Sequence, residues 1–294
     1  MATAARHGPT IAELRAGTEI DGVFACSRKD RLTARNGTTY LAVELRDRSG
    51  AIPARAFRDA DFLSSQFERG DLVRASGRVE RFRDELQVEL RSIRRVEQGA
   101  ADPADFLPVA YRDVGELDGF LEHLAREVYD PDYRRLLDAF LGDAAFRREL
   151  RRAPCTRAGH HAYLGGLLEH TVAVATLAQE ACALHPRLNS DLLLTAAVLH
   201  DVGKTREFEY GAEIALSAEG ALLGHLALGQ LLLEERVRSM PRDRWLVLAH
   251  CVLAHHGADG LPGRRFRSPE ALALYRLNAV DAAVKGALEH GLPA

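Results

Sequence analysis

Few cysteines and the lack of any long apolar run characterise this sequence of 294 residues. Cys26, Cys155, Cys182 and Cys251 lie far apart and form no C-x-x-C motif, which indicates reduced thiols rather than a disulfide framework. No apolar run approaches the ~20 residues needed to span a bilayer, and the N-terminus lacks the apolar core of a signal peptide. We therefore expect a cytoplasmic protein that does not enter a membrane.

Two common catalytic signatures are also missing. The sequence contains no G-x-x-x-x-G-K-[ST] loop, which argues against a nucleoside-triphosphate motor, and no serine or cysteine stands out as a nucleophile. Lysine is scarce, with Lys29, Lys204 and Lys285 among 39 basic residues. A hydrophobic fraction of 47% and a charged fraction of 28% are typical of a soluble globular protein. The length suits two modest domains.

Residues 18–97 follow a short N-terminal extension, residues 1–17, and have the pattern of a small β-barrel. Asn36-Gly37 and Ser49-Gly50 mark chain reversals, and the segment 59–70 has helical apolar spacing with Gly70 as its predicted end. The predicted strands are 18–29, 38–47, 51–58, 71–80 and 85–96, which are β-branched or alternating. Five strands with one helix after the third predict an OB-fold.

Residues 98–112 lose all periodicity and carry Gly99, Pro103 and Pro108, so we interpret them as a linker. Residues 113–294 are predicted to form an all-α domain, because apolar residues recur at i, i+3 and i+4. The predicted helical segments are 117–128, 132–152, 165–185, 191–203, 219–237, 243–257 and 269–290.

Histidine and aspartate recur within these apolar helical segments. A single helical histidine is more often structural than a metal ligand, but a polar ring among apolar residues is costly to bury without a partner. The candidates are His170, the doublet His200-Asp201, His225, the pair His255-His256, and Asp281. A shared metal site explains all of them together.

The number of these ligands favours two divalent ions. Imidazole nitrogen and carboxylate oxygen suit first-row divalent metals, and one shared carboxylate can hold two ions ~4 Å apart. A single tetrahedral ion needs only four ligands. We take Mn²⁺ as the first choice, with Fe, Co, Ni, Zn or Mg as alternatives.

The order H…HD…H…HH…D resembles the HD superfamily of metal-dependent phosphohydrolases in its binuclear form. The stretches HHAYLGGLLEHT (160–171), LLLTAAVLHDVGKTREF (192–208), GALLGHLALG (220–229) and LAHHG (253–257) look more narrowly like the YhaM-type 3′-to-5′ exoribonucleases. That family also carries an N-terminal OB domain, so the resemblance covers roughly residues 18–290.

This resemblance implies a role for each matching residue. His170, His200, Asp201 and an acid near the C-terminus would hold one metal. Asp201 would bridge to a second metal held by His225, His255 and His256. Asp201 and Lys204 would be catalytic, with Lys204 reaching a phosphate oxygen as a compact point charge, although a solvated helix lysine is the alternative. His160 and His161 would contact substrate or orient a ligand, although a packing role is equally open.

The sequence departs from the family pattern at two places. Where relatives show D-x-x-D near the last helix, this chain has Asn278 and Asp281, which share a helix face. We assign the metal-binding acid to Asp281, with Asn278 as the alternative ligand. The loop after His256 is long and rich in arginine, so Arg264 and Arg265 are candidate phosphate contacts or simply solvated residues.

Single-stranded nucleic acid is the partner that an OB-fold predicts, and such barrels bind it with aromatic side chains and positive charge on strands 2 and 3. Alternation places Tyr40, Arg55 and Phe57 on the outer face, unless the register is shifted by one residue. As an alternative, all three are partly exposed barrel residues.

We interpret the chain as a metal-dependent 3′-to-5′ exonuclease of single-stranded RNA, and of DNA as an extension, which hydrolyses phosphodiesters with activated water. Polarity and RNA preference come only from the resemblance. Two alternatives stay open: a phosphohydrolase of small or cyclic nucleotides, and a non-catalytic nucleic-acid-binding protein with a degenerate metal site. The oligomeric state is open as well, and a homo-oligomer is one alternative.

Overall fold

The computed structural model of the chain describes residues 9–34, 37–97 and 101–292. The chain forms two compact units, one with the residues up to Pro108 and Tyr210–Ile214, the other with Val109–Glu209 and the residues from Ala215 onward. Each unit has its own hydrophobic core. Residues 1–8 of the predicted extension, Asn36 of the first turn and residues 98–100 of the linker lie outside the described residues.

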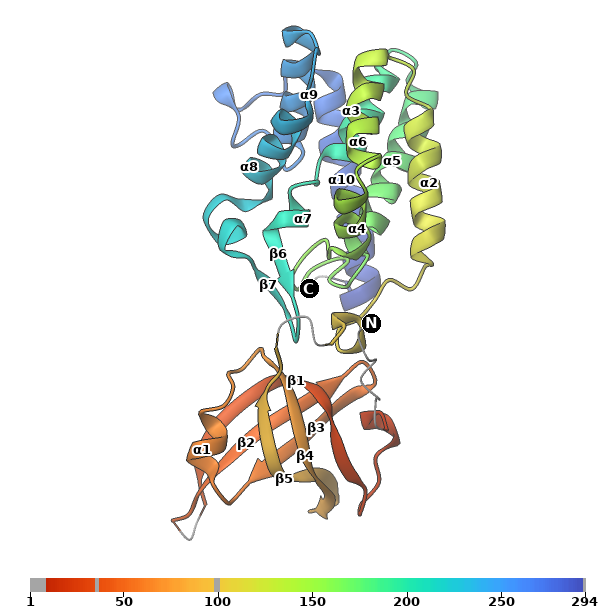
Figure 1. Ribbon diagram of the computed structural model, residues 1–294. Helices are drawn as coiled ribbons and strands as arrows, with labels where there is room; N and C mark the ends of the chain where they lie inside the picture. The colour runs from red at the N-terminus through yellow and green to blue at the C-terminus, as the bar shows by residue number, and fades with distance from the viewer. Residues whose placement is uncertain (1–8, 35–36, 98–100, 293–294) are drawn as a thin grey trace. The chain divides into compact units, whose positions relative to one another are not determined.

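The first unit is a closed barrel with the strand order β1-β2-β3-β5-β4 (Figure 1). β1 pairs with both β2 and β4, and all neighbours are antiparallel except β3 and β5. The strands are β1 (Glu19–Thr33), β2 (Thr39–Asp47), β3 (Gly50–Ala56), β4 (Leu72–Phe82) and β5 (Glu85–Arg95). The predicted five-stranded barrel is therefore confirmed.

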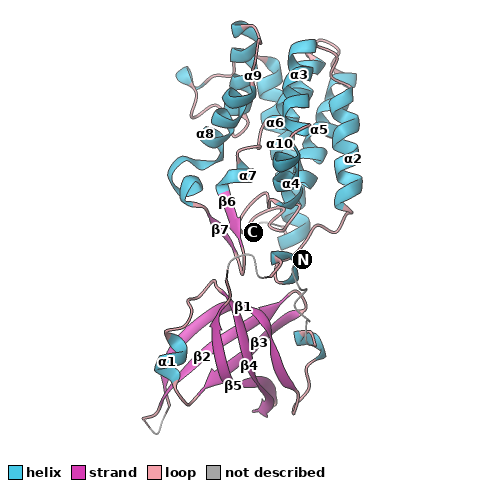
Figure 2. Cartoon of the chain, viewed as in Figure 1, coloured by secondary structure: helices cyan, strands magenta, loops and turns pink. Residues whose placement is uncertain are grey.

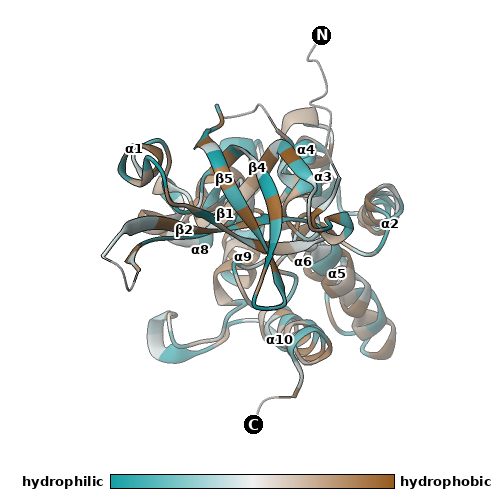
Figure 3. Cartoon of the chain, turned by 90° about the horizontal axis from the view of Figure 1, so that it is seen from below, coloured by the Kyte–Doolittle hydropathy of each residue, from teal (hydrophilic) through white to brown (hydrophobic). Residues whose placement is uncertain are grey.

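Alternation along β2 and β3 separates the barrel core from the outer face. The buried side chains of these strands are Leu41, Val43, Leu45, Ile52, Ala54 and Ala56. Tyr40 and Arg55 occupy the alternate positions and are only partly buried. Figure 3 shows the same alternation of hydrophobic and hydrophilic residues along β4 and β5. The pleat of each strand therefore sends one set of side chains inward and the other outward.

The helix predicted between the third and fourth strands exists but is short. α1 (Ala60–Ser64) begins after Asp59, which has a positive φ of 52°. The predicted end at Gly70 is wrong, because the helix stops at Ser64. Gly70 instead takes a φ of 88° in the turn before β4, where a side chain would be strained.

The second unit is built mainly from helices, as predicted (Figure 2). They are α2 (Val114–Arg126), α3 (Pro131–Leu141), α4 (Ala144–Arg152), α5 (Gly166–Leu184), α6 (Ser190–Leu199), α7 (Lys204–Glu207), α8 (Ala218–Arg236), α9 (Arg242–Ala254) and α10 (Pro269–His290). The segment predicted as one helix over 132–152 is divided at Gly142. Asp143 ends this break by capping α4, since its carboxylate accepts from the N–H groups of Ala145 and Phe146.

One short sheet interrupts the helical domain predicted over residues 113–294. β6 (Phe208–Tyr210) and β7 (Ile214–Leu216) form a two-stranded sheet directly after α7. Each strand has three residues, which is too short for an alternating pattern to be recognised in the sequence.

α6 lies at the centre of the helical core. Every residue from Leu192 to Leu199 is buried, and α6 packs against α3, α5, α9 and α10. A helix that is apolar on all sides is a buried helix. Its C-terminal end therefore carries His200 and Asp201 into the interior of the unit. Among the described residues, no helix combines the length and the apolar character needed to cross a membrane.

Candidate functional site

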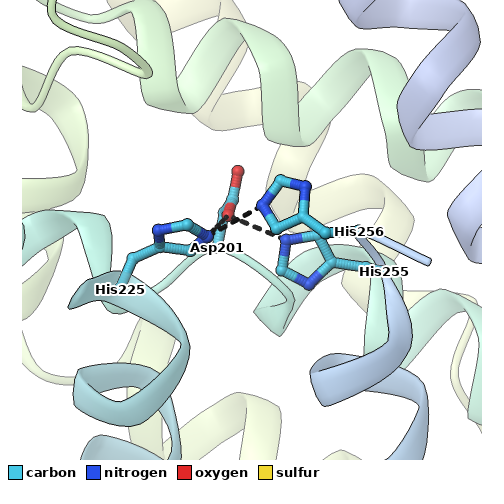
Figure 4. Close-up of side chains that lie close together, drawn as sticks. All are labelled: Asp201, His225, His255 and His256. Atoms are coloured by element: carbon cyan, nitrogen blue, oxygen red, sulfur yellow. Dashed lines mark hydrogen bonds and ion pairs between the residues drawn. The ribbon is translucent and has the colours of Figure 1, made fainter. Parts of the chain in front are cut away.

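The candidate metal ligands come from the ends and inner faces of five helices in the second unit. His170 lies on α5, His200 caps α6 and precedes Asp201, His225 lies on α8, His255 caps α9 and precedes His256, and Asn278 and Asp281 lie on α10. Segments far apart in the sequence are thus brought together. Figure 4 shows Asp201, His225, His255 and His256 turned toward one another.

Asp201 stands at the centre of the cluster, with a different set of histidines at each carboxylate oxygen. Oδ1 lies 3.3 Å from Nε2 of His255 and 3.7 Å from Nε2 of His225. Oδ2 lies 3.3 Å from Nε2 of His200 and 3.6 Å from Nε2 of His170. One carboxylate therefore serves two groups of imidazoles, which is the arrangement of a bridging ligand.

His200 and His255 are fixed in the same tautomer by the helices that they cap. Nδ1 of His200 donates to the carbonyl of Ala197 at 2.8 Å, and Nδ1 of His255 donates to that of Val252 at 2.6 Å. A neutral imidazole carries one N–H, so Nε2 of each ring keeps its lone pair. Both lone pairs face the interior of the cluster, as metal ligation requires.

A carboxylate fixes His225 in the corresponding way. Oε1 of Glu207 accepts from the backbone N–H of His225 at 3.0 Å and lies 3.1 Å from Nδ1 of its ring.

The backbone around His225 depends on two glycines. α8 is broken just before this residue, at Gly224, with a φ of 68°. A Cβ at Gly203 would lie 2.0 Å from the carbonyl oxygen of His225, so glycine is required there. Nε2 of His225 is left for the cluster.

The two candidate residues of α10 contact opposite edges of His170. Oδ2 of Asp281 lies 2.6 Å from Nδ1 of the ring, whereas Oδ1 of Asn278 lies 3.0 Å from its Nε2. The amide of Asn278 is oriented by its Nδ2, which donates to the carbonyl of His255 at 3.2 Å. The position facing His200 and Asp201 is thus taken by Asn278, and Asp281 lies behind the ring. Our assignment of Asp281 as a direct ligand stays a prediction, and this geometry favours Asn278.

The atoms that face one another in the cluster fit a cation. Among the described residues, Oδ1 of Asp201 and Nε2 of His255 are buried without a hydrogen-bond partner. Nε2 of His225 lies 2.9 Å from Nε2 of His256, so two imidazoles meet at nitrogen. Unpaired buried acceptors are costly, and a divalent ion satisfies several of them at once. The residues present therefore fit bound metal ions.

The electrostatics keep these side chains in the forms that bind metals. Burial lowers the pKa of His200 and His255 and, with the neighbouring His255, lowers the pKa of His256 to about 3. Burial alone would raise the pKa of Asp201, but Lys204 and His200 hold it well below its ordinary value. Neutral imidazole and ionised carboxylate are the species that coordinate divalent ions.

Lys204 is buried beside Asp201. Its Nζ lies 2.6 Å from Oδ2 of Asp201 and donates to Sγ of Cys155 at 3.4 Å. Burial opposes the charge of Lys204, but Asp201 raises its pKa above the ordinary value. The ammonium is therefore placed on the shared carboxylate, and its contact with a phosphate oxygen stays a prediction.

His160 and His161 take different environments. His161 is 1% exposed, with Nε2 3.1 Å from Oδ2 of Asp281 and Nδ1 2.8 Å from the hydroxyl of Tyr163. His160 is half-buried, and its ring lies 5.4 Å from that of His170. Of the two roles predicted for the pair, orientation of a ligand suits His161 better than contact with substrate.

Sequence reasoning missed three residues around the histidines. They are Glu207, Tyr163 and Glu169, which bond to ring nitrogens or to one another. Two signals were available, since Glu169 directly precedes His170 and Glu207 lies near the end of the stretch 192–208 that contains His200-Asp201. Acids inside apolar helical stretches need a partner when they are buried.

Arg264 and Arg265 are exposed on the loop between α9 and α10. Arg264 ends a short 3-10 turn, Pro262–Arg264, and has a positive φ of 48°. No hydrogen bond or ion pair joins either arginine to the histidine cluster within the described part of the chain. Their predicted role in gripping phosphate stays a prediction.

The outer face of the barrel carries a separate cluster of aromatic and cationic side chains. The rings of Tyr40 and Phe57 stack at 5.2 Å with an interplanar angle of 29°. The guanidinium of Arg55 lies 5.7 Å from the ring centre of Tyr40 and 5.3 Å from that of Phe82. Phe57 is 45% and Phe82 44% exposed, so part of each side chain is accessible to a ligand. Phe82, at the end of β4, was not predicted. We call these four residues the aromatic cluster.

Comparison with known protein families agrees with both units. Residues 167–283 match the family model described as "HD domain". Residues 25–96 match the family model described as "OB-fold nucleic acid binding domain". Among solved structures, the second OB-fold domain of replication protein A from Methanococcus maripaludis aligns with 31% of this chain and 96% of its own, at 19% identity and a TM-score of 0.26.

Curated relatives match most of the chain. The protein named "3'-5' exoribonuclease YhaM" from Oceanobacillus iheyensis is 30% identical over 244 residues, which cover 82% of this chain and 76% of the relative. The protein of the same name from Bacillus subtilis is 28% identical over 82% of this chain and 77% of the relative. The recognition of an HD-type chain with an OB-fold is confirmed, and the chain belongs to the family of the YhaM proteins.

Proposed function

We propose that the chain is a metal-dependent 3′-to-5′ exoribonuclease that removes nucleotides from single-stranded RNA. The observation that carries this proposal is the placement of Asp201 between two groups of imidazole nitrogens, in a chain whose relatives are named exoribonucleases. We propose two ions, with Mn²⁺ first. We propose single-stranded DNA as a second substrate. We also propose a cytoplasmic location, which the four free cysteines support because thiols stay reduced there.

The side chains would divide the work of phosphodiester hydrolysis between binding and orientation. Divalent ions at this site would make water available as a nucleophile near neutral pH and offset negative charge on the phosphate. Asp201 would align the two ligand groups, and Lys204 would hold the shared carboxylate ionised through the contact at 2.6 Å. The backbone and carboxylate partners of the rings would keep each Nε2 directed inward.

Access to the cluster would be from the side of His225 and His256. Asp201, His200 and His255 are buried, whereas His256 is exposed and the side chain of His225 retains 18% of its accessible surface. A phosphate group must reach the site from the side where ligands meet solvent. We therefore propose that the scissile phosphate binds next to these two histidines.

The aromatic cluster would hold single-stranded RNA on the barrel. Every base has a π-face, so stacking on Tyr40, Phe57 and Phe82 tolerates any sequence. Arg55 adds a positive charge within reach of the phosphates and is already held against two of these rings. This supports a substrate of single-stranded polynucleotide rather than a small nucleotide.

A labelled single-stranded RNA tests the proposal. With Mn²⁺, 5′-labelled RNA should yield a ladder that shortens with time, and 3′-labelled RNA should release its label at once as a mononucleotide. Asp201→Asn should abolish both, whereas Asp138→Asn, at an exposed ion pair with Arg134 on α3, should not. Intact RNA beside cleaved mononucleotide or cyclic-nucleotide substrates would support the small-nucleotide alternative. RNA binding without cleavage in any divalent metal would support a degenerate site.

A further inference from the structure

A continuous chain of hydrogen bonds runs from His170 toward the start of α5. Oδ2 of Asp281 lies 2.6 Å from Nδ1 of His170 and 3.1 Å from Nε2 of His161. Nδ1 of His161 lies 2.8 Å from the hydroxyl of Tyr163, which donates to Oε2 of Glu169 at 2.8 Å. We call Asp281, His161, Tyr163 and Glu169 the relay. It joins α10, the loop before α5 and α5 itself.

The donors and acceptors of the relay set its direction. A tyrosine hydroxyl has one proton, and that of Tyr163 is given to the carboxylate of Glu169, while the carboxylate of Asp281 can only accept. His161 is therefore the donor to both of its neighbours, through Nδ1–H to Tyr163 and through Nε2–H to Asp281, when both ring nitrogens carry a proton. Asp281 accepts from Nδ1–H of His170, and Nε2 of His170 therefore keeps its lone pair for the cluster. Removing the Tyr163 hydroxyl leaves His161 without this partner.

The distance between Asp281 and His170 argues against a shared ion on that edge. Two ligands of one ion, each at ~2.1 Å, lie about 3.0–3.4 Å apart. The observed 2.6 Å is shorter than this and lies close to the length of a charge-assisted hydrogen bond. Asp281 is placed to orient the ring rather than to bind the ion at Nε2.

The loop that carries His161 is held firmly in place. His161 has a positive φ of 52°, its N–H donates to Oε2 of Glu289 at 3.0 Å, and its carbonyl accepts from the N–H of Cys155 at 3.1 Å. A Cβ at Gly166 would lie 2.2 Å from that carbonyl oxygen. At the far end of the relay, Nζ of Lys285 lies 3.3 Å from Oε1 of Glu169. Such fixation suits residues that position another side chain.

We propose that His161 and Tyr163 are positioning residues that act through Asp281 to hold His170 toward one of two metal positions. The inference rests on the metal dependence of the proposed function. The position concerned is formed by His170, His200, Asp201 and Asn278. The other position, formed by Asp201, His225, His255 and His256, has no contact with the relay among the described residues, and Glu207 serves it instead. The relay therefore sets the affinity of one ion and leaves the other unchanged.

Equilibrium dialysis of the whole chain against Mn²⁺, with bound metal counted by mass spectrometry, tests this inference without an activity assay. Tyr163→Phe keeps the ring and removes both hydrogen bonds of the hydroxyl. We expect it to lower the affinity for one ion about 10- to 100-fold, which is the usual effect of losing an outer partner of a metal ligand. The affinity for the second ion should stay at the wild-type value. His161→Gln cannot bridge Asp281 and Tyr163 as the imidazole does, so it should lower the affinity for the same ion.

Tyr129→Phe is the matched control, since its exposed hydroxyl donates to Glu127 at 3.2 Å on the surface of the same unit. It should bind both ions as the wild type does. Wild-type affinity for both ions in Tyr163→Phe and His161→Gln, or equal weakening of both ions, would overturn the inference. RNA cleavage is measured separately, so a wild-type protein that binds two ions but leaves RNA intact would overturn the proposed function and not the relay.

Discussion

Nε2 of His255 and Oδ1 of Asp201 lie 3.3 Å apart, both buried, and neither makes a hydrogen bond within the described residues. Two acceptors in this position repel one another unless a cation lies between them. The metal-free protein therefore carries an electrostatic cost at its centre, and binding of metal removes it. Metal should stabilise the fold as well as serve catalysis.

Thermal unfolding with and without Mn²⁺ measures this stabilisation. A ligand at 100 times its Kd contributes about 2.7 kcal/mol to the free energy of unfolding, which in a unit of this size raises Tm by about 5–10 °C. The increase should be absent in Asp201→Asn and retained in Asp138→Asn. An equal Tm with Mn²⁺ and with EDTA in the wild type would contradict a preformed metal site.

Asn278→Asp should strengthen the metal position next to His170. Oδ1 of Asn278 already lies 3.0 Å from Nε2 of that ring, so the variant places a negative charge where a neutral amide now stands. We expect the affinity of one Mn²⁺ to rise at least about tenfold, since ligand charge sets the affinity for hard cations. Equilibrium dialysis measures the change. Asn189→Asp is the control, because Asn189 is the N-cap of α6 and aspartate is an equally good N-cap residue. It should leave the affinity for both ions unchanged. An unchanged affinity for both ions would show that Asn278 is not a metal ligand.

Phe57→Ala should weaken binding of single-stranded RNA by about 1–3 kcal/mol, because one base loses its stacking surface. Fluorescence anisotropy on an Asp201→Asn background measures the Kd without cleavage. Phe62→Ala is the matched control, since Phe62 is 65% exposed on α1 and lies outside the aromatic cluster. Equal Kd values for the two variants would show that the cluster does not hold RNA.

Asp118 should govern part of the acid stability of the helical unit. Burial alone would raise the pKa of this carboxyl, but hydrogen bonds from Arg147 and Arg151 hold it below its ordinary value. The unfolded chain therefore binds more protons as pH falls through about 4, and stability is lost there. Asp118→Asn should lower the free energy of unfolding by about 2–3 kcal/mol at pH 7. It should also make the loss of stability below about pH 4 smaller than in the wild type, which urea unfolding at several pH values measures. An unchanged pH profile would exclude the role.

Much of the fold was predictable because apolar periodicity is strong in both units. The alternation that buries Leu41, Val43 and Leu45 also fixes which face carries Tyr40. Periodicity failed where elements were short, as at β6 and β7, and where one polar cap divided a helical pattern, as at Asp143. Local capping decides such boundaries, and the apolar pattern does not record it.

The candidate site was predictable only to the level of residue identity. Polar rings in apolar helices indicated a cluster, and the structure brings His170, His200 and His255 around Asp201. Which nitrogen faces inward depends on tertiary partners such as Asp281, and no sequence spacing encodes it. Spacing alone placed Asn278 and Asp281 on one helix face and could not assign their different contacts with the ring.

Anomalous X-ray diffraction from crystals grown with Mn²⁺ tests the central claim, that Asp201 bridges two metal ions. The account predicts two anomalous peaks about 3.5–4 Å apart, one beside each carboxylate oxygen of Asp201. One peak should be next to His225, His255 and His256, and the other next to His170, His200 and Asn278. A single peak, or two peaks that do not share Asp201, would contradict the account.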